Sequence, residues 1–132
     1  MALNVLIVDD SAVMRAIIIK TMRISGLPLG EIYQAANGKE GLDALSQHWI
    51  DLVIVDINMP VMNGEEMIDC MLENPDSKDI PTVVVSTEGS QTRIKRLQLK
   101  GVRFIHKPFS PEIIRDTVKE ITGLGANDEE TT

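Results

Sequence analysis

Two apolar runs that each end in aspartate constrain the fold of this chain more than any other feature. The runs are Val5–Val8 and Leu52–Val55; Asp9 and Asp10 follow the first, and Asp56 follows the second. A continuous apolar run of this length is typical of a strand that is buried on both faces of a parallel sheet. A carboxylate at the end of such a strand is costly to bury without a compensating partner, so both strand ends are candidate functional positions.

The rest of the chain alternates between segments with strand patterns and segments with helical spacing. This alternation predicts an α/β fold in which five parallel strands carry five helices on both faces of the sheet. Gly64 is expected to let the chain turn into the third helix. The expected strands are residues 4–8, 32–36, 52–55, 82–86 and 102–106. The expected helices are residues 11–24, 39–47, 64–74, 90–100 and 111–121.

Helical spacing also predicts which side chains face the core. The residues at helical spacing are Met14, Ile17, Ile18 and Met22 in the first helix and Met67, Ile68, Met71 and Leu72 in the third, and we expect these to form the inward faces. The glycine-rich, acidic residues 124–132 are expected to form a flexible tail outside a single domain at residues 1–123.

Composition excludes several function classes. The formal net charge of -7 argues against nonspecific nucleic-acid binding, which needs clustered cations. No apolar run approaches the roughly 18 residues of a membrane span, and the first residues lack the pattern of a secretory signal. We therefore expect a cytoplasmic protein without membrane binding, and nothing in the sequence demands more than a monomer.

Acidic, hydroxyl and ammonium groups follow the predicted strand ends. Asp9, Asp10, Asp56 and Ser86 lie at carboxyl ends of strands, and Lys107 follows the fifth strand. Carboxyl ends of parallel strands meet at one edge of the sheet, so these five side chains are expected to converge. Three carboxylates there would repel one another by roughly 4 kcal/mol per close pair at an effective dielectric of about 20. Such a cluster of hard oxygen ligands, without histidine or cysteine, favours Mg²⁺.

The same group of residues is suited to phosphoryl chemistry. Lys107 offers a positive point charge and Ser86 a hydroxyl donor, and each can hold one phosphoryl oxygen. A carboxylate beside these groups and Mg²⁺ can attack phosphorus to form an acyl phosphate. Asp56 is the expected nucleophile because its strand is central among the strand ends.

Four motifs in this order resemble those of a response regulator receiver domain of the single-domain chemotaxis type. They are Val8-Asp-Asp-Ser11, Asp56-Ile-Asn-Met-Pro-Val-Met-Asn-Gly64, Ser86 and Lys107-Pro108-Phe109. The resemblance extends along essentially the whole chain up to the tail. It implies a flavodoxin-like, doubly wound sheet with strand order 2-1-3-4-5, and a cis peptide bond before Pro108.

The resemblance also implies a role for each site residue. Asp56 would be the phosphoacceptor. Asp10, Asp56 and the backbone carbonyl of Asn58 would bind Mg²⁺, with Asp9 acting through water. A switch of this kind would have no enzymatic turnover beyond self-phosphorylation from small acyl phosphates and autodephosphorylation.

Ser86 and Lys107 would hold the phosphoryl oxygens, and Ser86 and Phe104 would act as switch residues. The implied partners are a sensor histidine kinase as phosphodonor, a phosphatase, and an effector on the surface of the fourth helix, fifth strand and fifth helix. In a chemotaxis pathway that effector would be the flagellar motor switch. Residues 93–119 hold eight Lys or Arg and two acids, a local charge of +6 that favours an acidic partner.

Three alternatives stay open at this point. A receiver could pass its phosphate to a histidine phosphotransfer protein, as a phosphorelay intermediate. A phosphohydrolase of the haloacid dehalogenase type would need a second acid two residues after the nucleophile, where Asn58 stands. A flavodoxin would share the fold, but Asp9 and Asp10 would repel its phosphate.

One position departs from the family pattern. Thr87 stands where the family usually has alanine or glycine, and its branched side chain is expected to slow phosphoryl exchange.

Overall fold

The described part of the chain, residues 2–124 of a computed structural model, is built on five parallel strands in the order β2-β1-β3-β4-β5. This is the order that the family resemblance implied. The strands are β1 Leu3–Val8, β2 Leu29–Ala35, β3 Leu52–Val55, β4 Thr82–Ser86 and β5 Arg103–His106. The helices are α1 Ala12–Ile24, α2 Gly38–Gln47, α3 Gly64–Glu73, α4 Gln91–Gln98 and α5 Pro111–Thr122.

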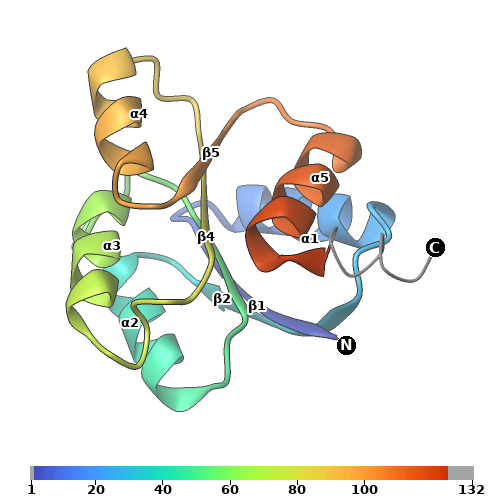
Figure 1. Ribbon diagram of the computed structural model, residues 1–132, viewed down its shortest axis with the longest axis horizontal. Coiled ribbons are helices and arrows are strands. Elements are labelled where there is room, and N and C mark those ends of the chain that lie inside the picture. The colour runs from blue at the N-terminus through green and yellow to red at the C-terminus, as the bar shows by residue number, and fades with distance from the viewer. Residues whose placement is uncertain (1, 125–132) are drawn as a thin grey trace.

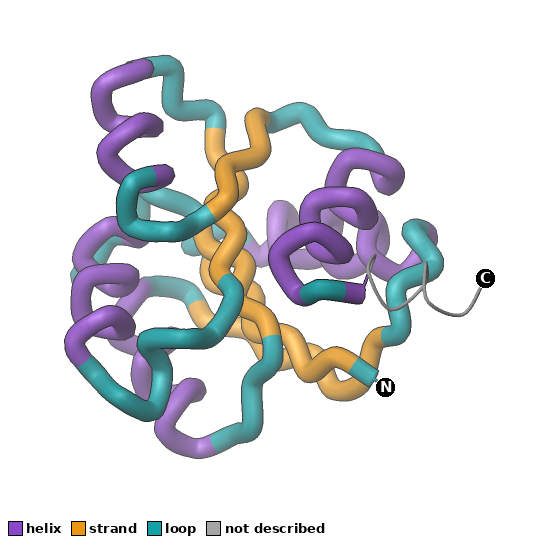
Figure 2. Tube along the Cα trace, viewed as in Figure 1, coloured by secondary structure: helices purple, strands orange, loops and turns teal. Residues whose placement is uncertain are grey.

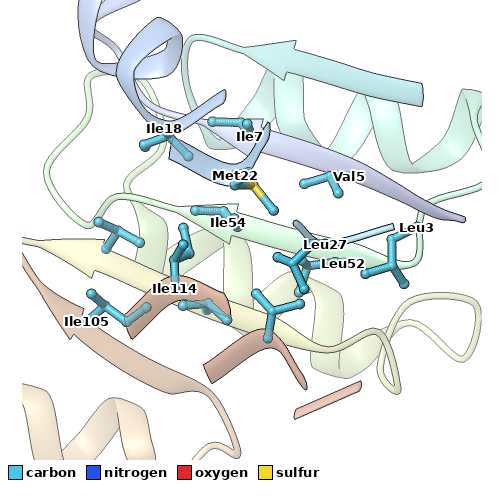
Figure 3. Close-up of a cluster of buried hydrophobic side chains, with 13 residues drawn as sticks. Leu3, Val5, Ile7, Ile18, Met22, Leu27, Leu52, Ile54, Ile105 and Ile114 are labelled. Atoms are coloured by element: carbon cyan, nitrogen blue, oxygen red, sulfur yellow. The ribbon is translucent and has the colours of Figure 1, made fainter. Parts of the chain in front are cut away.

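The sheet is covered on both faces, with α1 and α5 on one side and α2, α3 and α4 on the other (Figures 1 and 2). Side chains alternate between the two faces of each strand, so neighbouring residues such as Ile7 and Val8 belong to different cores. Ile18 of α1 and Ile114 of α5 pack on Ile7 and Ile54 in the first core (Figure 3). Burial on both faces explains why the central strands are continuous apolar runs.

Each helix begins at a polar residue whose side chain accepts a hydrogen bond from the first turn. Ser11 accepts from the backbone N–H of Met14. Asn63 and Glu66 form a reciprocal capping box at the start of α3. Ser11 sets the start of α1 immediately after Asp9 and Asp10, whereas Asn63 sets the start of α3 at the end of the loop that follows Asp56.

Several predicted details were wrong. Ile17 is 46% exposed and Leu72 is 40% exposed, although helical spacing predicted that both face the core. The edge strand β2 begins at Leu29, three residues before the predicted start, because Gly30 and Glu31 interrupt the apolar pattern between Leu29 and Ile32. Leu124, the first residue of the predicted tail, packs against the first core, and residues 125–132 lie outside the described residues.

Between residues 2 and 124, no helix combines the length and the apolar character that a membrane crossing requires.

Candidate functional site

The three aspartates that follow β1 and β3 come together at the carboxyl edge of the sheet. The two strands are hydrogen-bonded neighbours in which Val8 pairs with Val55, so the residues that follow them lie side by side. One carboxylate oxygen from each of Asp9, Asp10 and Asp56 lies within 4.8 Å of the others. Asp9 is buried, Asp56 is half-buried and Asp10 is exposed, so the cluster extends from the sheet to the surface.

The backbone holds one oxygen of each inner carboxylate. Asp9 Oδ1 accepts a hydrogen bond of 2.9 Å from the N–H of Ser11, and Asp56 Oδ1 accepts one of 2.8 Å from the N–H of Ile57. The second oxygen of each group faces Lys107, whose Nζ lies 3.3 Å from Asp9 Oδ2 and 3.6 Å from Asp56 Oδ2. The two carboxylates are therefore oriented before any ligand binds.

Lys107 is itself placed by β4. Its backbone N–H donates to the carbonyl of Ser86 at 3.0 Å, and the peptide bond that follows it, to Pro108, is cis, as the resemblance implied. A single ammonium group does not balance three carboxylates, so the site retains an excess of negative charge. Oxygen donors with this excess fit a hard divalent cation such as Mg²⁺.

Opposing effects act on the charge of Asp56. Burial raises the pKa of its carboxyl, while the positive charge of Lys107 and the hydrogen bond from Ile57 lower it. The nearby charge of Asp9 raises the pKa further, and a hydrogen bond with Ser86 lowers it. A carboxylate with a raised pKa is a stronger nucleophile once it is ionised.

Ser86 and Phe104, the two predicted switch residues, lie on the neighbouring strands β4 and β5. The buried Ser86 hydroxyl accepts a hydrogen bond of 3.1 Å from the N–H of Glu88, besides its bond to Asp56. Phe104 is half-buried on the edge strand β5, where it pairs with Val84. Its ring meets that of His106 edge to face, with centroids 4.8 Å apart.

Two other predicted positions are exposed. Asn58 lies in the loop after Asp56, and the Thr87 side chain lies next to Ser86 on the surface. The idea that Thr87 slows phosphoryl exchange stays a prediction.

Gly64 has a role that the sequence did not reveal. It was expected to let the chain turn into the third helix, and α3 does begin at Gly64, but without a positive φ. A Cβ atom on Gly64 would instead lie 2.1 Å from the carbonyl oxygen of Asp56, and its N–H donates to the carbonyl of Ile57 at 2.8 Å. Gly64 therefore allows the start of α3 to pack directly against the backbone of the candidate nucleophile.

Arg15 is a second residue that the sequence analysis missed. Its guanidinium donates to the carbonyl of Asp9 and, at 3.0 Å, to Gln34 on β2. Arg15 lies one helical turn after the Ser11 cap, so its side chain is on the face of α1 that is next to Asp9. The spacing alone did not indicate this, because it does not say where α1 packs.

The basic residues between 93 and 119 are largely paired with carboxylates. Arg96 binds Glu65 of α3 through two hydrogen bonds of 2.6 and 2.7 Å, and Lys100 reaches Asp69 at 2.6 Å. The ion pairs Arg93–Glu88, Arg103–Glu120 and Arg115–Asp116 add to these. The predicted local excess of +6 is thus offset by acids that lie mostly outside the counted segment, and it no longer supports an acidic partner.

Comparison with known proteins identifies relatives of this arrangement. The family model for the response regulator receiver domain matches residues 5–119. A chemotaxis protein CheY homolog of Campylobacter jejuni is 31% identical over 128 residues, covering 96% of this chain and 97% of the relative.

Solved structures agree in fold. Chemotaxis protein CheY4 of Vibrio cholerae has a TM-score of 0.80 and 30% identity, covering 92% of this chain and 99% of that one. The CheX-CheY-BeF3-Mg complex from Borrelia burgdorferi gives a TM-score of 0.81 and 29% identity, covering 90% of this chain and 88% of that one.

Proposed function

Because the chain belongs to the response regulator receiver domain family, we propose that it is a phosphorylation-activated switch of a two-component system, with Asp56 as phosphoacceptor. The observation that carries this proposal is the convergence of three carboxylates where two buried strands end, with Lys107 beside two of them, Asp9 and Asp56. The names of the CheY relatives support chemotaxis signalling as the pathway.

In the proposed reaction the ionised Asp56 carboxylate attacks the phosphorus of a phosphohistidine or of a small acyl phosphate. A new oxygen–phosphorus bond forms, and the bond to the leaving group breaks with its electron pair on the leaving group. Lys107 lies 3.6 Å from Asp56 Oδ2, close enough to turn toward an oxygen of the arriving group. Attack by water on the same phosphorus later returns the carboxylate and ends the signal.

The residues present fit the divalent ion that the family implies. Asp10, Asp56 and the backbone carbonyl of Asn58 are the proposed ligands, and Asp9 is proposed to act through water. When bound, Mg²⁺ would offset the repulsion among the carboxylates and the charge on the transferring group. The chain's own contribution is to hold the inner carboxylates in place through the N–H groups of Ser11 and Ile57.

We propose that the signal leaves the site through Ser86. To donate to a phosphoryl oxygen, the Ser86 hydroxyl must break its hydrogen bond with Asp56. This movement also alters the hydrogen bond that the hydroxyl accepts from the N–H of Glu88, in the loop before α4. Phe104 lies on the neighbouring strand and would occupy the vacated space. The population of conformations at the surface of α4, β5 and α5 then shifts, which changes its affinity for an effector.

The proposed partners follow from this role. A sensor histidine kinase would supply the phosphate, an effector such as the flagellar motor switch would read the surface of α4, β5 and α5, and a phosphatase would shorten the signal. A role with these partners supports a cytoplasmic location, and we propose that the chain acts as a monomer. Asn58 stands where a haloacid dehalogenase would need its second acid, which favours a switch over a phosphohydrolase.

The test is the intact mass of the protein after incubation with acetyl phosphate and Mg²⁺. We expect a gain of one phosphate that is absent in Asp56→Asn and after chelation of the metal. Asp43→Asn, which changes an exposed acid on α2, is the matched control and should still gain the phosphate. A gain that persists in Asp56→Asn, or a continuous release of phosphate over many turnovers, would overturn the proposal.

A further inference from the structure

An exposed tryptophan stands beside a hollow at the end of the sheet opposite Asp56. Trp49 lies between α2 and β3 and is 80% exposed. Leu45, Ile50 and Ile80 line the adjoining hollow of about 420 Å³, together with Asp76. At about 3.3 Å per strand residue, β3 separates this end of the molecule from Asp56 by roughly 16 Å. The surface is therefore distinct from the candidate phosphorylation site.

The Trp49 ring is held in place although it faces solvent. Its Nε1–H donates to Asp51 Oδ1 at 3.1 Å, and Asp51 Oδ2 accepts from the backbone N–H of Asn4 at 2.9 Å. Beside it, His48 stacks on Tyr33 with centroids 4.0 Å apart. A large aromatic side chain with a fixed orientation loses little freedom on binding, and tryptophan is enriched among residues that dominate binding energy.

The hollow continues across the helices on this face. A second depression of about 320 Å³ lies between α2 and α3, which run side by side in Figure 1, and Leu45 and Asp76 line both depressions. Leu42 and Cys70 add to its lining. We call the surface formed by Leu45, Trp49, Ile50, Cys70, Asp76 and Ile80 the Trp49 face. It is long enough to receive several side chains of an extended or helical segment.

Charge identifies the kind of segment that fits. Residues 40–79 hold ten acids and one base, a local charge of -9 on a chain with a net charge of -7. Setting aside Asp56 at the candidate site, and Glu65 and Asp69, which pair with α4, leaves seven acids against Lys78. Asp76 on the Trp49 face is exposed, and so is Asp43, which lines a further depression on the other side of His48.

We propose that the Trp49 face docks a cationic amphipathic segment of another protein. Apolar side chains of that segment would fill the hollow beside Leu45 and Ile80. A Lys or Arg of the same segment would lie over the Trp49 ring and next to Asp76, where a cation–π contact and a charge pair act together. The negative charge excludes a nucleic acid as the occupant. Docking is independent of phosphorylation because the face lies at the opposite end of β3.

The experiment uses the whole chain and three short synthetic peptides. One is an amphipathic peptide of Lys and Leu, the second has Glu in place of Lys, and the third has Ser in place of Leu. Trp49 is the only tryptophan, so intrinsic fluorescence reports on this face alone. We expect a saturable blue shift with the first peptide only, weakened by salt and unchanged when acetyl phosphate and Mg²⁺ are present.

Variants measured by calorimetry test the residues. Trp49→Ala should weaken binding of the Lys-Leu peptide by at least about tenfold, or 1.4 kcal/mol. Asp76→Asn should weaken it a few-fold. Leu99→Ala, at an 81% exposed residue that ends α4, is the matched control and should leave affinity unchanged. Amide shifts in the unmodified protein should cluster at residues 42–50 and 76–80, which tests the location without any substitution.

Three results would overturn the proposal. The peptide without leucine could bind as tightly as the first, which would reduce the interaction to net charge. Trp49→Ala could bind normally. Sedimentation could reveal self-association of the free chain that Trp49→Ala abolishes, which would assign the face to a second copy. None of these outcomes bears on phosphorylation of Asp56, so this proposal and the proposed function fail separately.

Discussion

At the scale of single residues, Asp56 is the side chain whose pKa is shifted in opposite directions by burial and by a neighbouring charge. Burial raises its pKa, and Lys107 only partly offsets this effect. A raised pKa in the folded state means that folding favours the protonated carboxyl. This stabilising contribution is complete below the ordinary value of 3.8 and is lost as the pH rises through the raised pKa. The folded protein is therefore less stable with Asp56 ionised, the form that attacks phosphorus, than with Asp56 protonated.

Asp56→Asn is accordingly expected to stabilise the metal-free protein at pH 7 by roughly 1 kcal/mol, the usual scale of a single-site effect. The gain should shrink as the pH falls toward 3.8, where the native carboxyl becomes protonated. Thermal unfolding at a series of pH values measures it, with Asp43→Asn as the exposed control. A difference between Asp56→Asn and the native protein that does not vary with pH would contradict this account.

Val61, in the loop between Asp56 and α3, has an unusual backbone. Its φ is 68°, a left-handed conformation that β-branched residues rarely adopt, and it is 78% exposed. Val61→Asn should stabilise the protein by about 1 kcal/mol because asparagine tolerates this conformation. Val61→Ile keeps the branch and should change nothing. Urea unfolding midpoints compare the three proteins, and an equal midpoint for Val61→Asn would mean that the loop is not strained.

The residues of the candidate site could be predicted from the sequence because each lies directly after a recognisable strand. Asp9, Asp56 and Lys107 needed only the rule that parallel strands end at one edge. Gly64 and Arg15 could not be placed in this way. Their contacts with the backbone of Asp56 and Asp9 depend on how helices pack against loops, and local spacing carries no record of that packing.

At the scale of elements, α3 and α4 are joined by a compact ionic network. Glu65 accepts two hydrogen bonds from Arg96 and one of 3.2 Å from Lys100, which also binds Asp69. Chiefly the hydrogen bond from Arg96, together with that from Lys100, lowers the pKa of Glu65 to about 2. These ion pairs hold α4 against α3, and α4 is part of the proposed effector surface, so the network links that surface to α3.

Glu65→Gln should destabilise the protein by about 1–2 kcal/mol, since charge-assisted hydrogen bonds from Arg96 and Lys100 are lost. A lowered pKa stabilises the folded state above the ordinary value of 4.5, and this contribution is lost as the pH falls toward 2. The unfolding free energies of the native protein and Glu65→Gln should therefore become equal as the pH falls from 4.5 toward 2. Glu73→Gln, at the exposed end of α3, is the control and should leave stability unchanged. Amide hydrogen exchange in α4 should become faster in Glu65→Gln but not in Glu73→Gln.

Element type was easier to predict than element orientation. The buried strands β3 and β4 have the predicted bounds because their apolar runs are short and rich in β-branched residues, which favours a strand over a buried helix. Ile17 was placed wrongly because α1 carries more apolar residues than its buried stripe needs, and only Ile18 and Met22 are buried. Spacing alone cannot choose among such residues.

At the scale of the whole molecule, two segments of the chain carry opposite net charges. Residues 40–79 carry -9 and residues 93–119 carry +6. From the sequence we predicted that the positive segment forms a docking surface for an acidic partner. In the fold, Glu65 and Asp69 instead pair with Arg96 and Lys100 of that segment. A segment count could not anticipate pairing across 31 to 35 positions of sequence.

Binding of an ion at the carboxyl edge should stabilise the entire fold. With Mg²⁺ at about ten times its dissociation constant, the expected gain in unfolding free energy is about 1.4 kcal/mol. Thermal unfolding with increasing Mg²⁺ measures it. Asp10→Asn, at an exposed member of the cluster, should reduce the gain, whereas Asp79→Asn should not. Equal gains in both variants would point to nonspecific binding.

The proposed switch depends most on the arrangement of one metal ion and one phosphoryl group at the carboxyl edge of the sheet. A crystal structure with Mg²⁺ and the phosphoryl analogue beryllofluoride measures that arrangement directly. We predict beryllium bonded to an Asp56 oxygen, the metal ion among Asp10, Asp56 and the Asn58 carbonyl, and Ser86 and Lys107 on the fluorine atoms. A structure with the analogue on another residue, or with Lys107 still paired to Asp9 and out of reach of the fluorines, would contradict it.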